Sequence, residues 1–413
     1  MRGGAGDQLS IGERIAFYRR RRGLSQAVLA DLVGRSEDWL SKIERGERDI
    51  RRLDVLAEVA RALRVTLGDL LGEPVLMEDE ERNDDVPAIR DALMAPRRLS
   101  RTLFSSSMSP EYIDPAPVKV LVEGAWSSYQ KGDLGRVVQA LPGLIKTTAQ
   151  MEAASADDPA YRRTCAALSA RIHHLTATTL SKIGEADLSW IAAERAMQAA
   201  DEADDPLVLA SAARSGTHAL LAVGRFEDAL ELGEAAAKWL HPRMAAGDPS
   251  ALSLYGMLYL RTAVAAARHQ DRGTSNDLLA HATRAGNQLG VDANYWHTGF
   301  GPANVELHRL SAALDLGDVA QVIEQAPNVK VDHLPEERQV TYLIDYARAL
   351  SLMAKDDEAL QTLLSAEQKS PAIVRHSTAV REVVRSMYRR APATAGRKSS
   401  ALLALAERCG AVR

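Results

Sequence analysis

Basic, acidic and hydroxyl side chains are closely spaced in one short stretch, GRSEDWLSKIERGERDI, residues 34–50. Its polar residues include Arg35, Ser36, Glu37, Asp38, Ser41, Lys42, Arg45 and Arg48. On a helix these side chains would share one end and one face. Lysine and arginine there can neutralise phosphate groups, while hydroxyl, amide and carboxylate groups can hydrogen-bond to base edges. The alternative is a solvated charged face. Because Arg51 and Arg52 follow this helix, the spacing of the cations favours contact with nucleic acid over the alternative.

Two acids near the front of this helix have two interpretations. Glu37 and Asp38 follow Ser36, a good N-cap, and the helix dipole favours negative charge in the first turn by roughly 0.3–1 kcal/mol. A carboxylate can also accept a hydrogen bond from cytosine N4 in the major groove. Both roles stay open from the sequence, and in either case the neighbouring cations must supply the attraction to phosphate.

The surrounding residues predict five short helices between residues 10 and 72. Ile11, Ile15 and Tyr18 repeat at helical spacing, Ser25 can cap the segment QAVLADLVG, and Gly34 can form the turn before the Ser36 helix. In the second helix, Leu29, Leu32 and Val33 are expected on one inner face. Further helices are expected from residue 53 and in TLGDLLG, residues 66–72.

This arrangement resembles the repressor-like (XRE type) helix-turn-helix family of regulators. The matching strings are GLSQAVLADLVG, LSKIERG and LGDLL, and the resemblance covers residues 10–72. It implies that the third helix enters the major groove while the second crosses the DNA backbone. It also implies that Gln26 contacts the DNA backbone and that Arg19 and Glu44 form an ion pair. The family often carries a proline where this chain has IRR, residues 50–52. The DNA-binding residues expected in this way are Ser25, Gln26, Arg35, Ser36, Glu37, Asp38, Ser41, Lys42, Arg45 and Arg48.

The charge distribution predicts separate domains in the 413-residue chain. Residues 1–72 contain 14 Lys and Arg against 11 Asp and Glu, whereas residues 73–89 contain seven acids and one arginine. We expect a DNA-binding domain over residues 1–72, an acidic linker with connecting helices over residues 73–117, and a helical domain over residues 118–413. The whole chain is expected to be all-α.

A weak repeat runs through the third region. Residues 219–242, ALLAVGRFEDALELGEAAAKWLHP, fit the tetratricopeptide pattern, with a turn at Gly224. Similar turns are expected at Gly132, Gly184, Gly317 and near residue 354, and the hairpin at residues 258–289 looks less regular. Stacked pairs of this kind form an α-solenoid with a concave surface.

Aromatic residues gather in ANYWHTGFGPANVELHR, residues 293–309, although aromatics make up only 5% of the chain. The segment could line a ligand pocket beside a helix N-terminus, or it could be an aromatic corner between repeats. Residues 118–390 resemble the tetratricopeptide-like tails of actinobacterial regulators with repressor-like domains. Related tails bind signalling peptides, often through asparagines, which implicates Asn304. The candidate ligand residues are Tyr295, Trp296, His297, Phe300, Asn304 and His308.

These patterns predict a homodimeric transcriptional regulator that binds an operator with two half-sites. A peptide or small-molecule effector would bind the repeats. The alternative is an interaction scaffold or antitoxin-like protein whose repeats dock a protein partner. We find no phosphate-binding loop and no hydrolase or metalloprotease motif, and so expect no enzymatic activity, no cofactor and no metal. Two cysteines and the absence of a long apolar run predict a cytoplasmic, nucleoid-associated protein without membrane contact.

Overall fold

The computed structural model describes residues 10–21, 24–48, 50, 53–63, 65, 70, 86–95, 112–154, 158–391 and 400–411. The predicted contacts of Arg51 and Arg52, the predicted fifth helix apart from Leu70, and the acidic stretch over residues 73–85 lie outside these ranges. The chain divides into two compact units, Met1–Arg82 and Asn83–Arg413. The described secondary structure is helical apart from one isolated bridge between Ala293 and Phe300, which confirms the predicted all-α class.

The first unit contains α1 (Ile11–Arg21), α2 (Gln26–Leu32), α3 (Glu37–Glu44) and α4 (Leu53–Leu63). Its core is formed by residues that the helical periodicity had placed inside, among them Ile15, Leu29, Leu40 and Ile43. Leu32 is an exception: it is 59% exposed, and Ala30 takes the inner position instead. The prediction for Leu32 was wrong because α2 turns Leu29, Ala30 and Val33 inwards.

Close packing of α1 against α3 depends on Gly12. A Cβ at this position would lie 1.9 Å from the carbonyl oxygen of Ile43, so no larger side chain fits without moving a helix. The backbone turns between the following helices also use glycine, since Gly34 and Gly46 have φ of 62° and 73°. The close packing at Gly12 and the turns at Gly34 and Gly46 set the orientation of α3 against the core.

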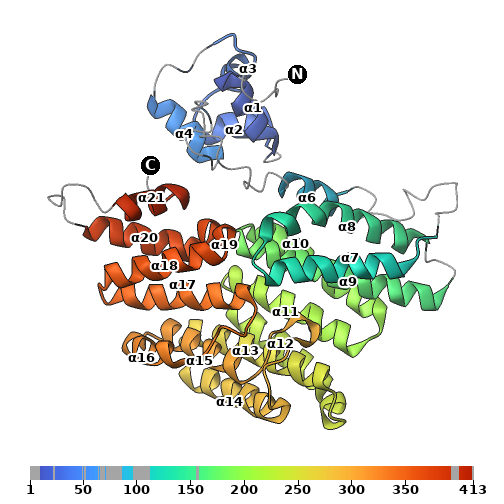
Figure 1. Ribbon diagram of the computed structural model, residues 1–413. Helices are drawn as coiled ribbons and strands as arrows, with labels where there is room; N and C mark the ends of the chain where they lie inside the picture. Colours follow the sequence, from blue (N-terminus) through green and yellow to red (C-terminus); the bar gives the residue numbers. More distant parts are fainter. Residues whose placement is uncertain are drawn as a thin grey trace. The chain divides into compact units, whose positions relative to one another are not determined.

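The second unit is a series of antiparallel helices (Figure 1). In chain order they are α6 (Val86–Leu93), α7 (Pro115–Gln130), α8 (Leu134–Ala154), α9 (Pro159–Lys182), α10 (Ala186–Ala203), α11 (Pro206–Ala222), α12 (Phe226–Ala245), α13 (Pro249–Arg268), α14 (Arg272–Leu289), α15 (Pro302–Asp315), α16 (Val319–Gln325), α17 (Glu336–Leu352), α18 (Asp356–Lys369), α19 (Pro371–His376), α20 (Thr378–Arg390) and α21 (Ser400–Arg408), with short 3₁₀ turns η2 (Tyr295–His297) and η3 (Ala326–Asn328). No helix among the described residues is both long and apolar enough to cross a bilayer.

The predicted hairpin turns are present. Gly132, Gly184, Gly224 and Gly317 all have φ between 72° and 87°, and Ala354 has φ of 56°. The hairpin that looked irregular is a regular pair, α13 and α14. Its turn is hard to recognise because Gln270, rather than glycine, adopts the left-handed conformation, with φ of 64°.

An Asp-Pro pair begins the first helix of four successive hairpins. Asp114, Asp158, Asp205 and Asp248 each accept a backbone N–H hydrogen bond through the side chain, and proline occupies the next position. Such a cap contributes about 1 kcal/mol, and proline is preformed for the first helical residue. The Asp-Pro pairs therefore identify the start of each of these four hairpins more precisely than the tetratricopeptide pattern does.

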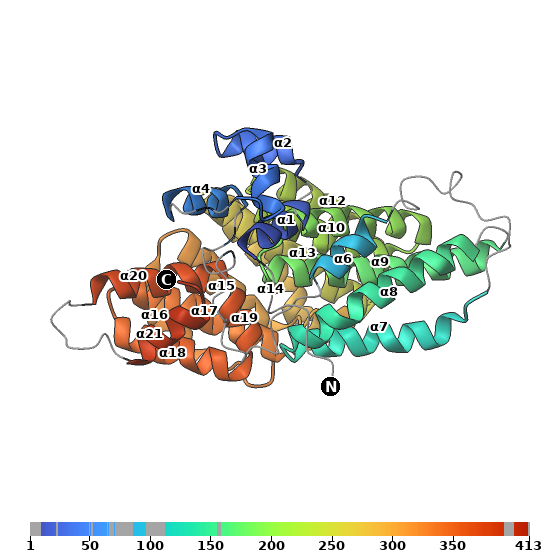
Figure 2. The same ribbon diagram turned by 90° about the horizontal axis from the view of Figure 1, so that it is seen from above.

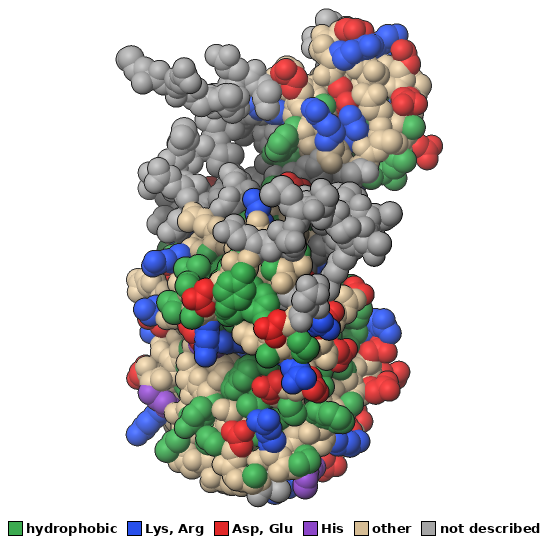
Figure 3. Space-filling model, turned by 90° about the vertical axis from the view of Figure 1, so that its right-hand side faces the viewer, with side chains coloured by type: hydrophobic (Ala, Val, Ile, Leu, Met, Phe, Trp, Pro, Cys, Tyr) green, Lys and Arg blue, Asp and Glu red, His purple; other side chains and the backbone are tan. Residues whose placement is uncertain are grey.

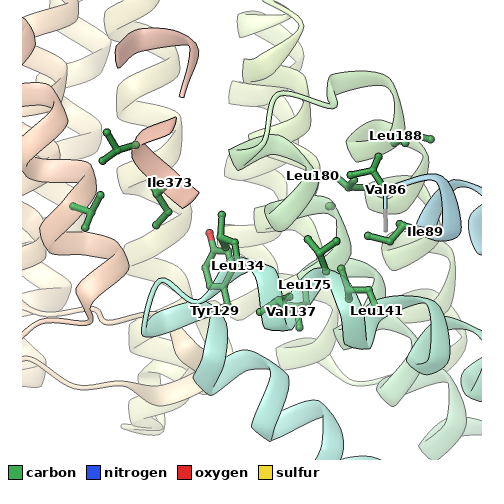
Figure 4. Close-up of a cluster of buried hydrophobic side chains, with 14 of the residues drawn as sticks. Val86, Ile89, Tyr129, Leu134, Val137, Leu141, Leu175, Leu180, Leu188 and Ile373 are labelled. Atoms are coloured by element: carbon green, nitrogen blue, oxygen red, sulfur yellow. The ribbon is translucent and has the colours of Figure 1, made fainter. Parts of the chain in front are cut away.

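Helix α6 belongs to the second unit. Val86, Ile89 and Leu93 are buried in the same core as the first helices of the repeats. Figure 4 shows Val86 and Ile89 beside Leu180 and Leu188. The helical domain therefore begins at Asn83 by its contacts, earlier than the predicted boundary at 118.

The last helices of the second unit contact the first helices of the same unit. Helix α19 contacts α8, and α17 contacts α7. Ser370 donates a hydrogen bond to the Gly132 carbonyl over 2.7 Å, and Lys182 reaches Glu337 at 2.6 Å. In Figure 2 the pairs follow a curve from α7 to α20. The inner surface of this unit is therefore lined by helices from both ends of the repeat array.

Candidate functional site

Two serine caps fix α2 and α3 in the first unit. The Ser25 hydroxyl accepts from the Val28 N–H at 3.1 Å, and the Ser36 hydroxyl accepts from the Trp39 N–H at 3.2 Å. Both caps are those expected from the sequence. The left-handed Gly34 connects the two helices, so α3 begins at an exposed corner that carries Arg35, Ser36 and Glu37.

A buried carboxylate joins α1, α2 and α3. Glu44 accepts bonds from Arg19 Nε at 2.5 Å and from Arg19 Nη2 at 2.8 Å, which confirms the predicted ion pair. Gln26 Nε2 donates to the same carboxylate at 2.8 Å. The bond to Glu44 raises the pKa of the Arg19 guanidinium. The contact of Gln26 with the DNA backbone stays a prediction, and in this structure Glu44 orients the Gln26 side-chain amide.

The outer face of α3 carries the expected polar groups. Glu37 and Asp38 are exposed in the first turn, and Arg45 and Arg48 are exposed at the exit. Lys42 Nζ lies 2.7 Å from Asp38 Oδ2, so one of the two acids holds a cation on its own helix. An exposed pair of this kind contributes only about 0.3–0.5 kcal/mol, and phosphate can therefore replace it.

The remaining cations of this face are weakly held. Arg45 Nε lies 3.1 Å from Glu47 in an exposed pair, and the Arg35 guanidinium lies 5.9 Å from the centre of the Trp39 ring. Within the described residues Glu37 forms no hydrogen bond or ion pair. The outer face of α3 thus carries cations that can exchange their present contacts for phosphate. Beside them lie the Glu37 carboxylate and the Ser41 hydroxyl.

In the second unit, the aromatic segment is a strained loop. The bridge between Ala293 and Phe300 closes it, with the Ala293 N–H donating to the Phe300 carbonyl at 2.9 Å. Trp296 and His297 both adopt left-handed backbone conformations, with φ of 53° and 54°. Such residues cost of order 1–3 kcal/mol each, and they persist only where neighbouring contacts fix them.

The candidate ligand residues of this loop divide into two groups. Phe300 is fully buried and packs where Gly256 leaves room, since a Cβ on Gly256 would lie 1.9 Å from the ring. Asn304 is also fully buried, and its amide donates to the Gly299 carbonyl at 2.9 Å. His308 bonds through Nδ1 to the Asn304 carbonyl at 2.9 Å. These three side chains form the packed corner that was one of our two interpretations.

Tyr295, Trp296 and His297 lie on the other side of the loop. Tyr295 is 43% exposed, and the ring of Trp296 lies 5.5 Å from the Arg171 guanidinium. His297 stacks on Trp126 with ring centres 5.1 Å apart, and its Nε2 lies 2.7 Å from Glu123 Oε2. The loop is therefore attached to α7 through His297.

Arg171 and His297 together hold Glu123 ionised. Burial alone would raise its pKa, but Arg171 and then His297 lower the pKa of Glu123 to about 2. Burial lowers the pKa of His297, so its imidazole donates one N–H to Glu123 as a neutral ring. His297 also lies at the edge of a polar chamber inside the unit.

The hollow of this chamber has about 430 Å³ of space between atoms, counted together with the solvent at its opening. Apart from histidines, its charged lining residues are Arg214 of α11, Arg261 of α13, and Glu337 and Arg338 of α17. Trp126, Tyr129 and His174 contribute the wall beside α7 and α9. Sequence reasoning missed all of these residues. Among the described lining residues, His297 and Thr298 belong to the predicted ligand segment, and His297 is one of its candidate ligand residues.

Comparisons with known proteins bear on the first unit. Residues 10–73 match the family model described as "Helix-turn-helix domain". Residues 10–73 are a helix-turn-helix domain. The immunity repressor protein of Bacillus phage phi105 is 29% identical over 118 residues, which is 28% of this chain and 81% of the phage protein.

A solved complex of Bacillus thuringiensis PlcR with the peptide PapR7 and DNA is 14% identical. The match covers 68% of this chain and 95% of the PlcR chain, with a TM-score of 0.28. The helix-turn-helix domain is identified by its own family model and by the geometry of α2 and α3.

We expect Glu37→Gln in the helix-turn-helix domain to relax base preference at one position of the bound DNA. Asp38 is engaged by Lys42, whereas Glu37 is exposed and unengaged, so Glu37 is the carboxylate placed to accept from cytosine N4. The preference lost should be about 1–3 kcal/mol at that base pair. Selection from randomised DNA measures it, with Glu58→Gln on the exposed side of α4 as control. An unchanged preferred sequence of unchanged strength would exclude base reading by Glu37.

Proposed function

We propose that this chain is a transcriptional regulator in which the helix-turn-helix domain binds an operator as part of a homodimer. The observation that carries the proposal is the exposed polar face of α3, with Lys42, Arg45 and Arg48 around Glu37. In this geometry α3 enters the major groove and the basic exit of the helix contacts phosphate. One such domain covers half of a useful site, so a second copy is needed for a second half-site.

The second unit is the effector-binding part of the proposed regulator. Its support is the polar chamber, which is lined by helices from distant repeats, and the strained loop at its edge. An effector, peptide or small molecule, would change DNA binding only if it bound one arrangement of the repeats better than another. Within the predicted ligand segment, the position of His297 in the chamber lining supports this role, whereas Phe300 and Asn304 are fully buried.

The direct test of DNA contact is a salt titration. Arg45→Ala and Lys42→Ala should weaken binding to all sequences and make the plot of log affinity against log salt concentration shallower. Each lost phosphate contact removes about 0.9 from that slope. Fluorescence anisotropy with a labelled site selected by the full-length protein measures the change.

Arg61→Ala is the matched control, because Arg61 is an exposed cation of α4 outside the helix-turn-helix face. Its slope should equal that of the wild type. If Lys42→Ala and Arg45→Ala both bind with the wild-type slope and affinity, α3 is not the DNA-contacting helix and this proposal fails.

A further inference from the structure

The inner chamber of the second unit contains more positive charge than its carboxylate can neutralise. Arg214 and Arg338 are 7% and 8% exposed, and the charges of both Arg338 and Arg261 act on Arg214. Glu337 is the single carboxylate among the described lining residues. The exterior differs: on the face shown in Figure 3, acidic, basic and hydrophobic side chains of this unit are interspersed.

Glu337 is already engaged. Lys182 Nζ lies 2.6 Å from one of its oxygens, and Arg338 Nε lies 3.4 Å from the other. Although burial alone would raise the pKa of Glu337, Arg338 and Lys182 hold it well below its usual range. This carboxylate is therefore in direct contact with Lys182 and Arg338, and among the described lining residues no second carboxylate faces Arg214 and Arg261.

Arg214 has unmet hydrogen-bonding capacity. Its Nε and Nη1 are buried and have no hydrogen-bond partner among the residues that the structure describes. A buried donor without a partner costs about 1–3 kcal/mol, and more when it is charged. Burial, Arg338 and Arg261 together lower the pKa of Arg214 to about 9. Among the described residues Arg261 also forms no hydrogen bond or ion pair. A group that is costly to the fold and that faces a cavity is characteristic of a binding site.

The neutral groups around the arginines are compatible with an anion. Burial holds the pKa of His174 and of His218 well below the ordinary value, so neither ring adds charge at neutral pH. Thr178 and Tyr129 contribute hydroxyl groups to the same lining. Guanidinium groups match the geometry of carboxylate and phosphate oxygens, with two parallel bonds to each partner.

We propose that the chamber binds an oxyanion, the carboxylate or phosphate group of a small effector, through Arg214, Arg261 and Arg338. The anion would supply the missing counter-charge and connect α11, α13 and α17. Anion binding itself can be tested without DNA, whereas its regulatory role rests on the proposed function. Since α17 is separated from α11 and α13 in the chain, a bound anion would favour the arrangement that holds the three helices together.

The test is thermal unfolding of the full-length protein in sodium phosphate, sodium succinate and sodium chloride at matched ionic strength. Phosphate or succinate should raise the wild-type melting temperature above the chloride reference. At one hundred times the dissociation constant the rise should be about 5 °C. A response to phosphate alone or to succinate alone assigns the group that the chamber prefers.

Arg214→Met and Arg261→Met should abolish this response. In chloride, Arg214→Met should melt above the wild type, because repulsion and an unpartnered charge are removed. A merely structural arginine would have the opposite effect. Arg408→Met is the control, since Arg408 pairs with Glu367 outside the chamber and Arg375 remains beside that carboxylate. It should retain the full response.

Two results would overturn the anion site: a wild type that responds to neither anion, or a response retained in both Arg214→Met and Arg261→Met. Anion binding that leaves the affinity for DNA unchanged would overturn its role as effector. This failure differs from failure of the proposed function, which the Lys42 and Arg45 variants test by DNA binding alone.

Discussion

Glu44→Ala is expected to destabilise the helix-turn-helix domain by up to about 3–5 kcal/mol, because it leaves the part-buried Arg19 guanidinium without its ion-pair partner. Glu44 is 9% exposed and receives bonds from both Arg19 and Gln26. A domain of this size has only about 5–15 kcal/mol of stability in total. We therefore expect the domain to open frequently and to lose specific DNA binding, although α3 retains its DNA-facing side chains.

Hydrogen exchange in the full-length protein measures this effect, because it reports on α1, α2 and α3 separately from the repeats. Amides of these helices should exchange faster in Glu44→Ala, whereas those of α9 and α13 should not change. Glu58→Ala on the exposed side of α4 is the control. Wild-type protection in Glu44→Ala would show that the three-helix network contributes little.

Residues 1–82 alone are expected to bind an operator at least 100-fold more weakly than the full chain. This fragment is a compact unit with its own core, so it retains the DNA-contacting face. We propose that the dimer contacts lie in the second unit. Without them the second helix-turn-helix domain is no longer held near its half-site. Linking two binding modules typically increases affinity by about 10²–10⁴.

Anisotropy titration of fragment and full-length protein on the same DNA gives the ratio. Circular dichroism must show that the fragment is helical, and sedimentation must report the size of both species. A folded, monomeric fragment that binds as tightly as the full chain would mean that the second unit does not bring two domains together.

The helix-turn-helix domain could be predicted closely because its determinants are local. Ser25 and Ser36 begin helices, Gly34 makes the turn, and Ile15 and Leu40 mark inner faces, each within a few residues of what it specifies. Leu32 was misplaced because the choice between Leu32 and Ala30 depends on how α2 is rotated against the core. That rotation depends on tertiary packing.

The chamber could not be predicted from the sequence. Arg214, Arg261 and Arg338 lie on three helices from different repeats, and each by itself resembles an ordinary surface arginine. The aromatic segment, by contrast, drew attention through composition alone. Its division into a packed corner and a chamber edge depends on the space that Gly256 leaves for Phe300 and on the contact between His297 and Glu123.

The central claim, specific DNA binding through α3, is tested most directly by selection of bound fragments from genomic or randomised DNA with the full-length protein. The account predicts enrichment of one motif with two half-sites about one or two helical turns apart, lost when Lys42→Ala and Arg45→Ala are combined. No enriched sequence, or the same motif recovered at the same strength with the double variant, would contradict it.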